Sequence, residues 1–523
     1  MKQTATLDLN RLYPPALALV FAIGVAFRVY ALFAVGFDEP FDLGGLFYQM
    51  SLEIARNGFA MPVSIPYYYP GGLPFAYPPL AFYIQAALIR LFSPPLFLTV
   101  NLLPALFSVL SLGAFYLLAK EVIPSRWQSL AAMFIFAIIP LAVTEQVQAM
   151  GLAESLGTGA LILYTRSLVR AGRRPGARRW LAAGLMLALC VVSSPGSLYA
   201  AVLISLLFFA VSIYMGVKQR DWRGGRGCIL IGISGLILSA PYWLTVIANH
   251  GFGILTSAFA GQNTSLLVEM KENILAFRLI WVTPWWNALF LLCLGLILLR
   301  KQFLLFLFTA LLLVIIRERW IMSIAVSLVI SVGVGIALDL LSRLRWKKNA
   351  LIKVAVTWTL ALVLLYDAGA YLVYSINEEI YDLPAERVAD LQLIRSAQMI
   401  PPDGSVIAVG SLGLVEWSPA LLEREVLNNP FGLEWIAGRE EEMHYLTSQL
   451  QAVTDPLDYA PLIRQYFPRT RKVYLVLDNA WISPAVLSGI DAEDLTILAV
   501  FDHLTLVSLE LPDRSPLTFD SLP

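Results

Sequence analysis

The chain has 523 residues, of which 58% are hydrophobic and only 14% carry a charge. Soluble domains average roughly 25% charged residues, so this composition excludes a water-soluble protein. The formal net charge is zero, but the charges are unevenly distributed along the chain. Residues 377–523 hold 9 basic and 23 acidic residues, and the remainder has a net charge of +14. The basic residues are dispersed over loops and do not line one face, which excludes nucleic acid as a partner.

Long apolar runs follow one another from the N-terminus to about residue 371. A span needs about 20 apolar residues, because the bilayer interior has no water to satisfy a free backbone amide. Clusters of lysine and arginine stay cytoplasmic, and all of them fall on that side if about eleven helices cross the membrane. The predicted spans are 12–36, 98–119, 127–143, 153–169, 180–193, 197–216, 227–247, 284–299, 302–316, 320–341 and 350–371.

One segment, 76–92, would break this count if it crossed the membrane. It is short and begins with a proline pair, so we predict a helix on the outer membrane surface. The cytoplasmic side then carries 21 basic and 4 acidic residues, and the outer side 7 and 10. The sequence thus predicts a multi-pass plasma-membrane protein. Its transmembrane domain, 1–376, has a first outer loop, 37–100, with two surface helices.

The odd number of crossings places residues 377–523 outside the cytoplasm. In this region short apolar runs typical of strands alternate with helical patterns, which indicates a soluble α/β domain. The predicted strands are SVIAVG, VYLVLD, TILAVF and LTLVSLEL. None ends in a glycine-rich phosphate loop, so nucleotide binding has no support.

Acidic residues gather where spans leave the membrane on the outer side. Asp38 and Glu39 directly follow the first span. A carboxylate there can act as a general base toward a hydroxyl or bind a divalent metal, although a solvated charge at a helix end is the plainer interpretation. Glu145 and Glu154 flank the second outer loop, 144–153. On one continuous helix they would lie on opposite faces, so one of them faces a shared site.

Arginines on the outer side run against the usual charge bias. Arg317 and Arg319 flank Glu318 at the end of the ninth span. Their forked guanidinium groups suit a phosphate at the headgroup level, although pairing with Glu318 explains them equally well. Arg28 lies inside the first span, about 15 Å below Asp38. We expect it to bond to a neighbouring helix or to snorkel.

Two further outer residues are candidates for substrate binding. Tyr77 belongs to a group of aromatic residues at the outer interface, most of which we expect to be membrane anchors, with one or two free to stack on a sugar. His250 is a single histidine in the third outer loop, where a structural role is more common. The predicted spans after the first hold no acid in a central position, whereas an ion-coupled carrier usually needs one at the midplane.

The order of these features resembles the GT-C superfamily of membrane glycosyltransferases, which includes protein O-mannosyltransferases, aminoarabinose transferases and oligosaccharyltransferases. The resemblance covers residues 12–374. Its motifs are FDEPFDLGGLFYQMSLEIARNG, YPPLAFYIQAALIRLF, IPLAVTEQVQAMGLAESLGTG, PYWLTVIANHG and IRERW. Aminoarabinose transferases carry a lysine where Tyr77 stands, so the resemblance supports the superfamily and no particular subfamily.

By that resemblance Asp38 matches the catalytic aspartate of the first loop, Glu154 the acid of the second, and Arg317 or Arg319 a lipid-phosphate ligand. The resemblance implies a glycosyltransferase that moves a sugar from a polyprenyl-phosphate donor to a protein, lipid or glycan acceptor on the outer face. Mg²⁺ or Mn²⁺ between Asp38 and Glu154 is allowed but not required. The alternatives are a lipid carrier or flippase, and a GT-C-like scaffold that binds without catalysis.

Overall fold

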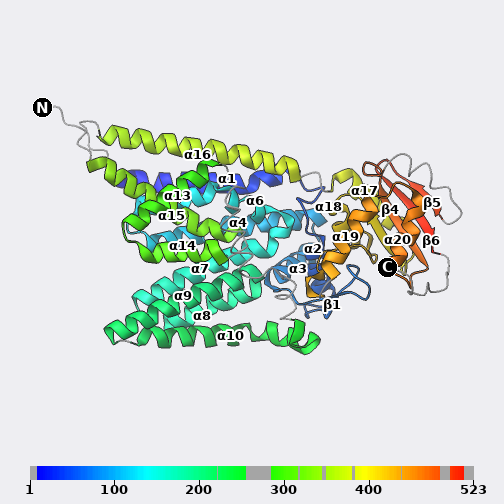
Figure 1. The fold of residues 1–523 in the computed structure, drawn as a ribbon, viewed down its shortest axis with the longest axis horizontal. Helices are drawn as coiled ribbons and strands as arrows, with labels where there is room; N and C mark the ends of the chain where they lie inside the picture. The colour runs from blue at the N-terminus through cyan, green and yellow to red at the C-terminus, as the bar shows by residue number, and fades with distance from the viewer. Residues whose placement is uncertain are drawn as a thin grey trace, which may run out of the picture.

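The computed structural model describes residues 9–220, 222–254, 284–315, 319–343, 349–379, 383–436, 439–482 and 495–511. Figure 1 shows two parts along the long axis of the molecule. A bundle of long helices occupies one end, and the C-terminal helices and strands occupy the other. The helices of the first loop lie between these two parts, so that loop is positioned to contact both.

Each of the eleven predicted spans overlaps a helix among the described residues. These helices are α1 (Leu9–Val35), α4 (Leu96–Val122), α5 (Arg126–Ile138), α7 (Leu152–Arg173), α8 (Ala177–Ser193), α9 (Pro195–Gln219), α10 (Arg223–His250), α13 (Pro284–Leu299), α14 (Phe303–Ile315), α15 (Arg319–Arg343) and α16 (Asn349–Glu379). In the described part of the chain, α1, α4, α9, α10, α15 and α16 are long and apolar enough to cross a membrane. The chain is therefore a membrane protein.

The bundle has a buried centre and an apolar outside. In α15 83% of the most apolar window is buried, whereas in α16 only 17% is, so α16 presents its apolar side chains outward. Small residues bring helices together at the start of α7. A Cβ added at Gly157 would lie 2.4 Å from the hydroxyl of Ser194, which caps the start of α9. A larger residue at 157 would force α7 and α9 apart.

The first loop contains both predicted helices, α2 (Gly45–Arg56) and α3 (Leu80–Phe92). Between them a short hairpin pairs β1 (Ser64–Ile65) with β2 (Leu73–Pro74). The second loop is not one helix, contrary to the geometry assumed for Glu145 and Glu154. It consists of η1 (Pro140–Ala142), α6 (Thr144–Val147) and η2 (Ala149–Gly151), because Pro140 ends α5 and the chain turns again before α7.

The C-terminal region folds as a mixed sheet with helices, as the strand pattern predicts. The sheet has the order β3-β4-β6-β5, in which β3 and β4 are parallel and the other pairs antiparallel. The described helices and strands of the C-terminal region are α17 (Ala385–Ser396), β3 (Ser405–Val409), α18 (Leu412–Leu422), η4 (Leu433–Trp435), α19 (Arg439–Gln451), η5 (Pro456–Asp458), α20 (Tyr459–Tyr466), β4 (Lys472–Asp478), β5 (Leu495–Val500) and β6 (Leu504–Glu510).

The first loop and the C-terminal region share one hydrophobic core. Leu46 and Met50 of α2 and Phe82 of α3 belong to the same buried cluster as Leu427 and Leu475 of the C-terminal region. Hydrophobic burial of this kind stabilises the two segments as one unit. The predicted boundary at 377 lies in the last turn of α16, and the C-terminal region beyond it packs on the first loop.

Candidate active site at the first two loops

The acid pair lies in the turn between α1 and α2. Asp38 is exposed, and Glu39 is partly buried. The Glu39 carboxylate accepts a hydrogen bond of 2.8 Å from the backbone N–H of Ala385, at the start of α17. Burial raises the pKa of Glu39, because the charged form is less well solvated, and the bond from Ala385 opposes this rise. Glu39 thus joins the loop to the C-terminal region and leaves Asp38 as the accessible acid.

A buried amide on α4 holds this turn from the bundle side. Asn101 is fully buried. Its side-chain oxygen accepts from Phe41 N–H at 3.0 Å, and its nitrogen donates to the carbonyls of Gly36 and Glu39 at 3.3 and 3.0 Å. One side chain therefore satisfies three backbone groups on either side of Asp38. Nothing in the local sequence around Asn101 signals this role, and sequence reasoning missed it.

A buried carboxylate of α18 holds the same loop from the opposite side. Glu416 is 2% exposed, and its carboxylate accepts from the backbone N–H groups of Gly44, Gly45 and Leu46 at 3.1, 2.8 and 2.7 Å. Such N–H groups have no partner inside a helix, and a negative charge is favourable there. Burial raises the pKa of Glu416, against these three bonds. This contact too was missed, because its partners are far apart in sequence.

The glycine pair of the DLGGLF motif makes room for this contact. A Cβ on Gly45 would lie 3.0 Å from the Glu416 carboxylate and 2.9 Å from the Tyr68 hydroxyl, and one on Gly44 would lie 2.6 Å from the side chain of Ala149. The neighbouring Trp417 donates its indole N–H to the carbonyl of Asp42 at 3.1 Å. The motif is therefore a docking surface for α18.

The second loop contacts the first loop directly. The N–H of Ala149 donates to the carbonyl of Phe41 at 2.8 Å. The predicted acid Glu154 follows in the first turn of α7, where a carboxylate is favoured by the helix dipole. It accepts a hydrogen bond of 3.0 Å from the hydroxyl of Tyr77. Tyr77 and Glu154, both predicted site residues, are thus brought together.

Aromatic rings surround Tyr77 and fix its direction. Its ring centroid lies 5.2 Å from that of Phe47, 5.7 Å from that of Phe82 and 6.3 Å from that of Trp435. These neighbours belong to α2, α3 and η4, so Tyr77 is packed by the first loop and the C-terminal region together. The ring is thus packed on several sides where its hydroxyl donates to Glu154.

The structure describes His250, whereas Arg317 and the side chain of Arg319 lie outside the described residues. His250 ends α10, a helix that contacts the first loop through Tyr242, whose hydroxyl donates to the carbonyl of Ala76 at 2.7 Å. The Nε2 atom of His250 is buried and has no hydrogen-bond partner in the described part of the chain. Arg317 lies outside the described residues, and Arg319 begins α15 with a side chain that is also outside them.

Arg28 bonds to neighbouring helices, one of the two outcomes expected for it. It is fully buried, and its guanidinium donates to the Ser108 carbonyl and hydroxyl of α4 at 3.1 and 2.9 Å. It also donates to the carbonyls of Ala137 and Phe136 of α5 at 2.9 and 3.3 Å. Arg28 therefore has a structural role below the site.

The described residues offer few donors for a metal. Among them, no group of three or more histidine, cysteine, aspartate or glutamate side chains is placed to hold an ion. Asp38 and Glu154 come from different loops, and one oxygen of Glu154 already accepts from Tyr77. Mg²⁺ is usually held by one or two carboxylates together with waters and substrate phosphates, so Asp38 and Glu154 stay candidate ligands for Mg²⁺ or Mn²⁺.

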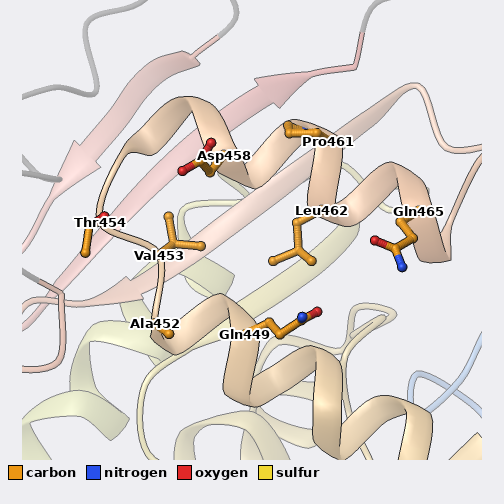
Figure 2. Close-up of a pocket in the computed structure, with 8 residues that line it drawn as sticks. All are labelled: Gln449, Ala452, Val453, Thr454, Asp458, Pro461, Leu462 and Gln465. Atoms are coloured by element: carbon orange, nitrogen blue, oxygen red, sulfur yellow. The ribbon is translucent and has the colours of Figure 1, made fainter. Parts of the chain in front are cut away.

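Two cavities among the described residues lie apart from these acids. A groove of about 460 Å³ lies between α19 and α20, where Gln449, Asp458 and Leu462 line it (Figure 2). A second cavity of about 320 Å³ lies among α7, α8, α9 and α10. It is lined mainly by apolar side chains, and also by the hydroxyl-bearing side chains of Tyr164 and Ser205. Neither contains a predicted site residue.

Comparison with known proteins identifies the fold. Residues 76–245 match the family described as dolichyl-phosphate-mannose-protein mannosyltransferase. No curated protein matches the chain by sequence. Among solved structures, the archaeal oligosaccharyltransferase AglB from Archaeoglobus fulgidus, in complex with an inhibitory peptide and a dolichol-phosphate, has a TM-score of 0.60 at 16% identity, over 90% of this chain and 70% of that chain.

Two further structures agree. ArnT from Cupriavidus metallidurans, bound to undecaprenyl phosphate, has a TM-score of 0.53 at 14% identity, over 96% of this chain and 98% of that chain. The Archaeoglobus fulgidus oligosaccharyltransferase in complex with Zn and sulfate has a TM-score of 0.58 at 15% identity, over 88% and 68%. The predicted resemblance to the GT-C superfamily is confirmed, and the fold is of this type.

Proposed function

We propose that this chain, whose fold is of the GT-C type, is a glycosyltransferase that takes its sugar from a polyprenyl-phosphate donor and works on the extracytoplasmic face of the membrane. The observation that carries the proposal is the meeting of two acid-bearing loops at one end of the bundle. The loop of Asp38 contacts the second loop through Ala149, and Glu154 lies at the helix start that follows. The matched family and the lipid phosphates in the similar structures favour such a donor.

The reaction is a displacement at the anomeric carbon of the sugar. The acceptor hydroxyl forms a new C–O bond there while the bond to the lipid phosphate breaks, and the phosphate leaves with the bonding electron pair. Asp38, the exposed acid, takes the proton of the acceptor hydroxyl, a step typically worth 10²- to 10⁴-fold in rate. Glu154, fixed by Tyr77, orients the acceptor through its carboxylate.

A divalent metal, if bound, would be held by Asp38 and Glu154, and the zinc of the oligosaccharyltransferase structure belongs to that protein. The acceptor is a protein, a lipid or a glycan with a free hydroxyl.

The topology is part of the proposal: eleven crossings, with the C-terminal region outside the cytoplasm. A single cysteine introduced at Ser405 should react with a membrane-impermeant maleimide added to intact cells. One introduced at Gly176, in the RAGRRPGARR loop, should react only after the membrane is permeabilised, because positively charged loops remain inside. The three native cysteines are replaced by alanine beforehand. Labelling of the residue-176 cysteine in intact cells would contradict this topology.

We further expect Arg317 and Arg319 to bind the phosphate of the donor. Lysine keeps the positive charge but cannot form the forked, bidentate contact. Arg317→Lys and Arg319→Lys should therefore each weaken binding of undecaprenyl phosphate, and the alanine variants should weaken it more. Microscale thermophoresis of the purified protein measures this affinity. Unchanged affinity in both alanine variants would show that the phosphate binds elsewhere.

A further inference from the structure

The turn that carries Asp38 is held on two sides by buried polar side chains from distant parts of the sequence. Asn101 reaches it from α4 of the bundle, and Glu416 reaches it from α18 of the C-terminal region. Between them they bond six backbone groups from Gly36 to Leu46. A turn without regular secondary structure normally satisfies such groups with water, and here protein side chains replace that water.

We propose that Asn101 and Glu416 form a clamp that positions Asp38, and that the C-terminal region acts in the reaction by supplying one half of this clamp. The proposal rests on the function proposed above and gives a role to the C-terminal region. Both residues are positioning residues, because each contacts the backbone of the turn and neither contacts the Asp38 carboxylate in the described structure.

Burial and geometry both favour a positioning role. Asn101 is 0% exposed and uses its amide oxygen and nitrogen in opposite directions, so neither aspartate nor leucine of similar size could make the same three bonds. Glu416 fits three converging N–H groups because an ionised carboxylate only accepts. Glutamine at 416 would direct an N–H group toward those donors, and the α2 end of the turn would loosen.

The other contacts of the turn connect the clamp to the C-terminal region. Glu39 accepts from Ala385 N–H, and Trp417 donates to the carbonyl of Asp42. The C-terminal region thus contacts the turn immediately after Asp38 as well as at the start of α2. A shift of α17 and α18 relative to the bundle would therefore move the backbone on which Asp38 stands.

The test uses the full-length protein in nanodiscs and the variants Asn101→Ala and Glu416→Gln. Each has a matched control: Ser111→Ala removes a buried polar group from the same helix α4, and Glu510→Gln removes a carboxylate that pairs with Lys472 at the exposed edge of the sheet. Hydrogen exchange followed by mass spectrometry reports the amides of residues 41–46. For turnover, the protein is incubated with polyprenyl-phosphate mannose, and total membranes are added as the acceptor source. The amount of polyprenyl phosphate released measures turnover.

The clamp predicts faster exchange at residues 41–46 in both variants, together with a fall in kcat of about 10- to 100-fold, because a small misplacement of a reacting group has effects of this size. Affinity for undecaprenyl phosphate should stay unchanged, and both controls should match the wild type. Wild-type kcat in the folded variants, or unchanged exchange in them, would overturn the proposal. Asp38→Asn tests the proposed function separately. If that variant kept its activity, the proposed function would fail, and the exchange result would still stand.

Discussion

Replacing Asp38 by asparagine should lower the turnover number about 100-fold or more and leave the protein folded. The side chain is exposed in the turn between α1 and α2, so its replacement should not affect stability. Asparagine keeps the size and polarity of the side chain but cannot accept a proton from the acceptor hydroxyl, and a positioned general base is worth about 10²- to 10⁴-fold in rate. Released polyprenyl phosphate per enzyme measures the effect.

The control is Glu53→Gln, which removes a carboxylate from α2 in the same loop. Glu53 pairs with the partly exposed Arg56, and such pairs contribute little to stability. This variant should stay folded, since a lost surface pair costs only about 0–1 kcal/mol of stability. Its activity should stay within about twofold of the wild type. Near-normal turnover by a folded Asp38→Asn protein would show that another group accepts the proton.

Replacing Arg28 by methionine should destabilise the bundle strongly. The helix α5 ends at Ile138 because Pro140 has no N–H to continue it, so its last carbonyls have no partner within the helix. Arg28 donates to two of them, at Phe136 and Ala137. Methionine fills a similar space but leaves these buried acceptors without a donor, at a cost of about 1–3 kcal/mol for each.

The expected result is a free energy of unfolding lower by about 3 kcal/mol or more, seen as a lower melting temperature in detergent. Arg28→Lys should be intermediate, because a single ammonium group cannot reach both α4 and α5 as the guanidinium does. The control Arg90→Met changes an exposed arginine of α3 and should leave the melting temperature nearly unchanged. An Arg28→Met protein as stable as the control would exclude this structural role.

Much of the fold could be predicted because its signals are local. A long apolar run is enough to predict a bundle helix. The short apolar runs VYLVLD and LTLVSLEL correctly predict two strands of the sheet, β4 and β6. The helical geometry assumed between Glu145 and Glu154 was wrong, because the chain turns twice between Pro140 and the start of α7. The packing of the C-terminal region on the first loop has no local signal at all.

Candidate site residues could be proposed only where chemistry and position coincide in the sequence. Asp38 and Glu154 are acids at the ends of apolar runs, and Tyr77 is one of the aromatic residues at the outer interface. Asn101 and Glu416 were missed because each bonds to backbone groups 60 or more residues away. A side chain that bonds to a distant backbone leaves no spacing pattern, and a buried asparagine in an apolar run looks like any other polar residue within a span.

The most direct test is to ask whether the purified protein breaks the bond between a sugar and its lipid phosphate. The protein is placed in vesicles with polyprenyl-phosphate mannose, and total membranes are added outside as the acceptor source. Mass spectrometry then counts free polyprenyl phosphate and transferred mannose. The account predicts equal amounts of the two with the wild type and almost none with Asp38→Asn. Movement of intact donor between leaflets without release of polyprenyl phosphate would contradict it and indicate a lipid carrier.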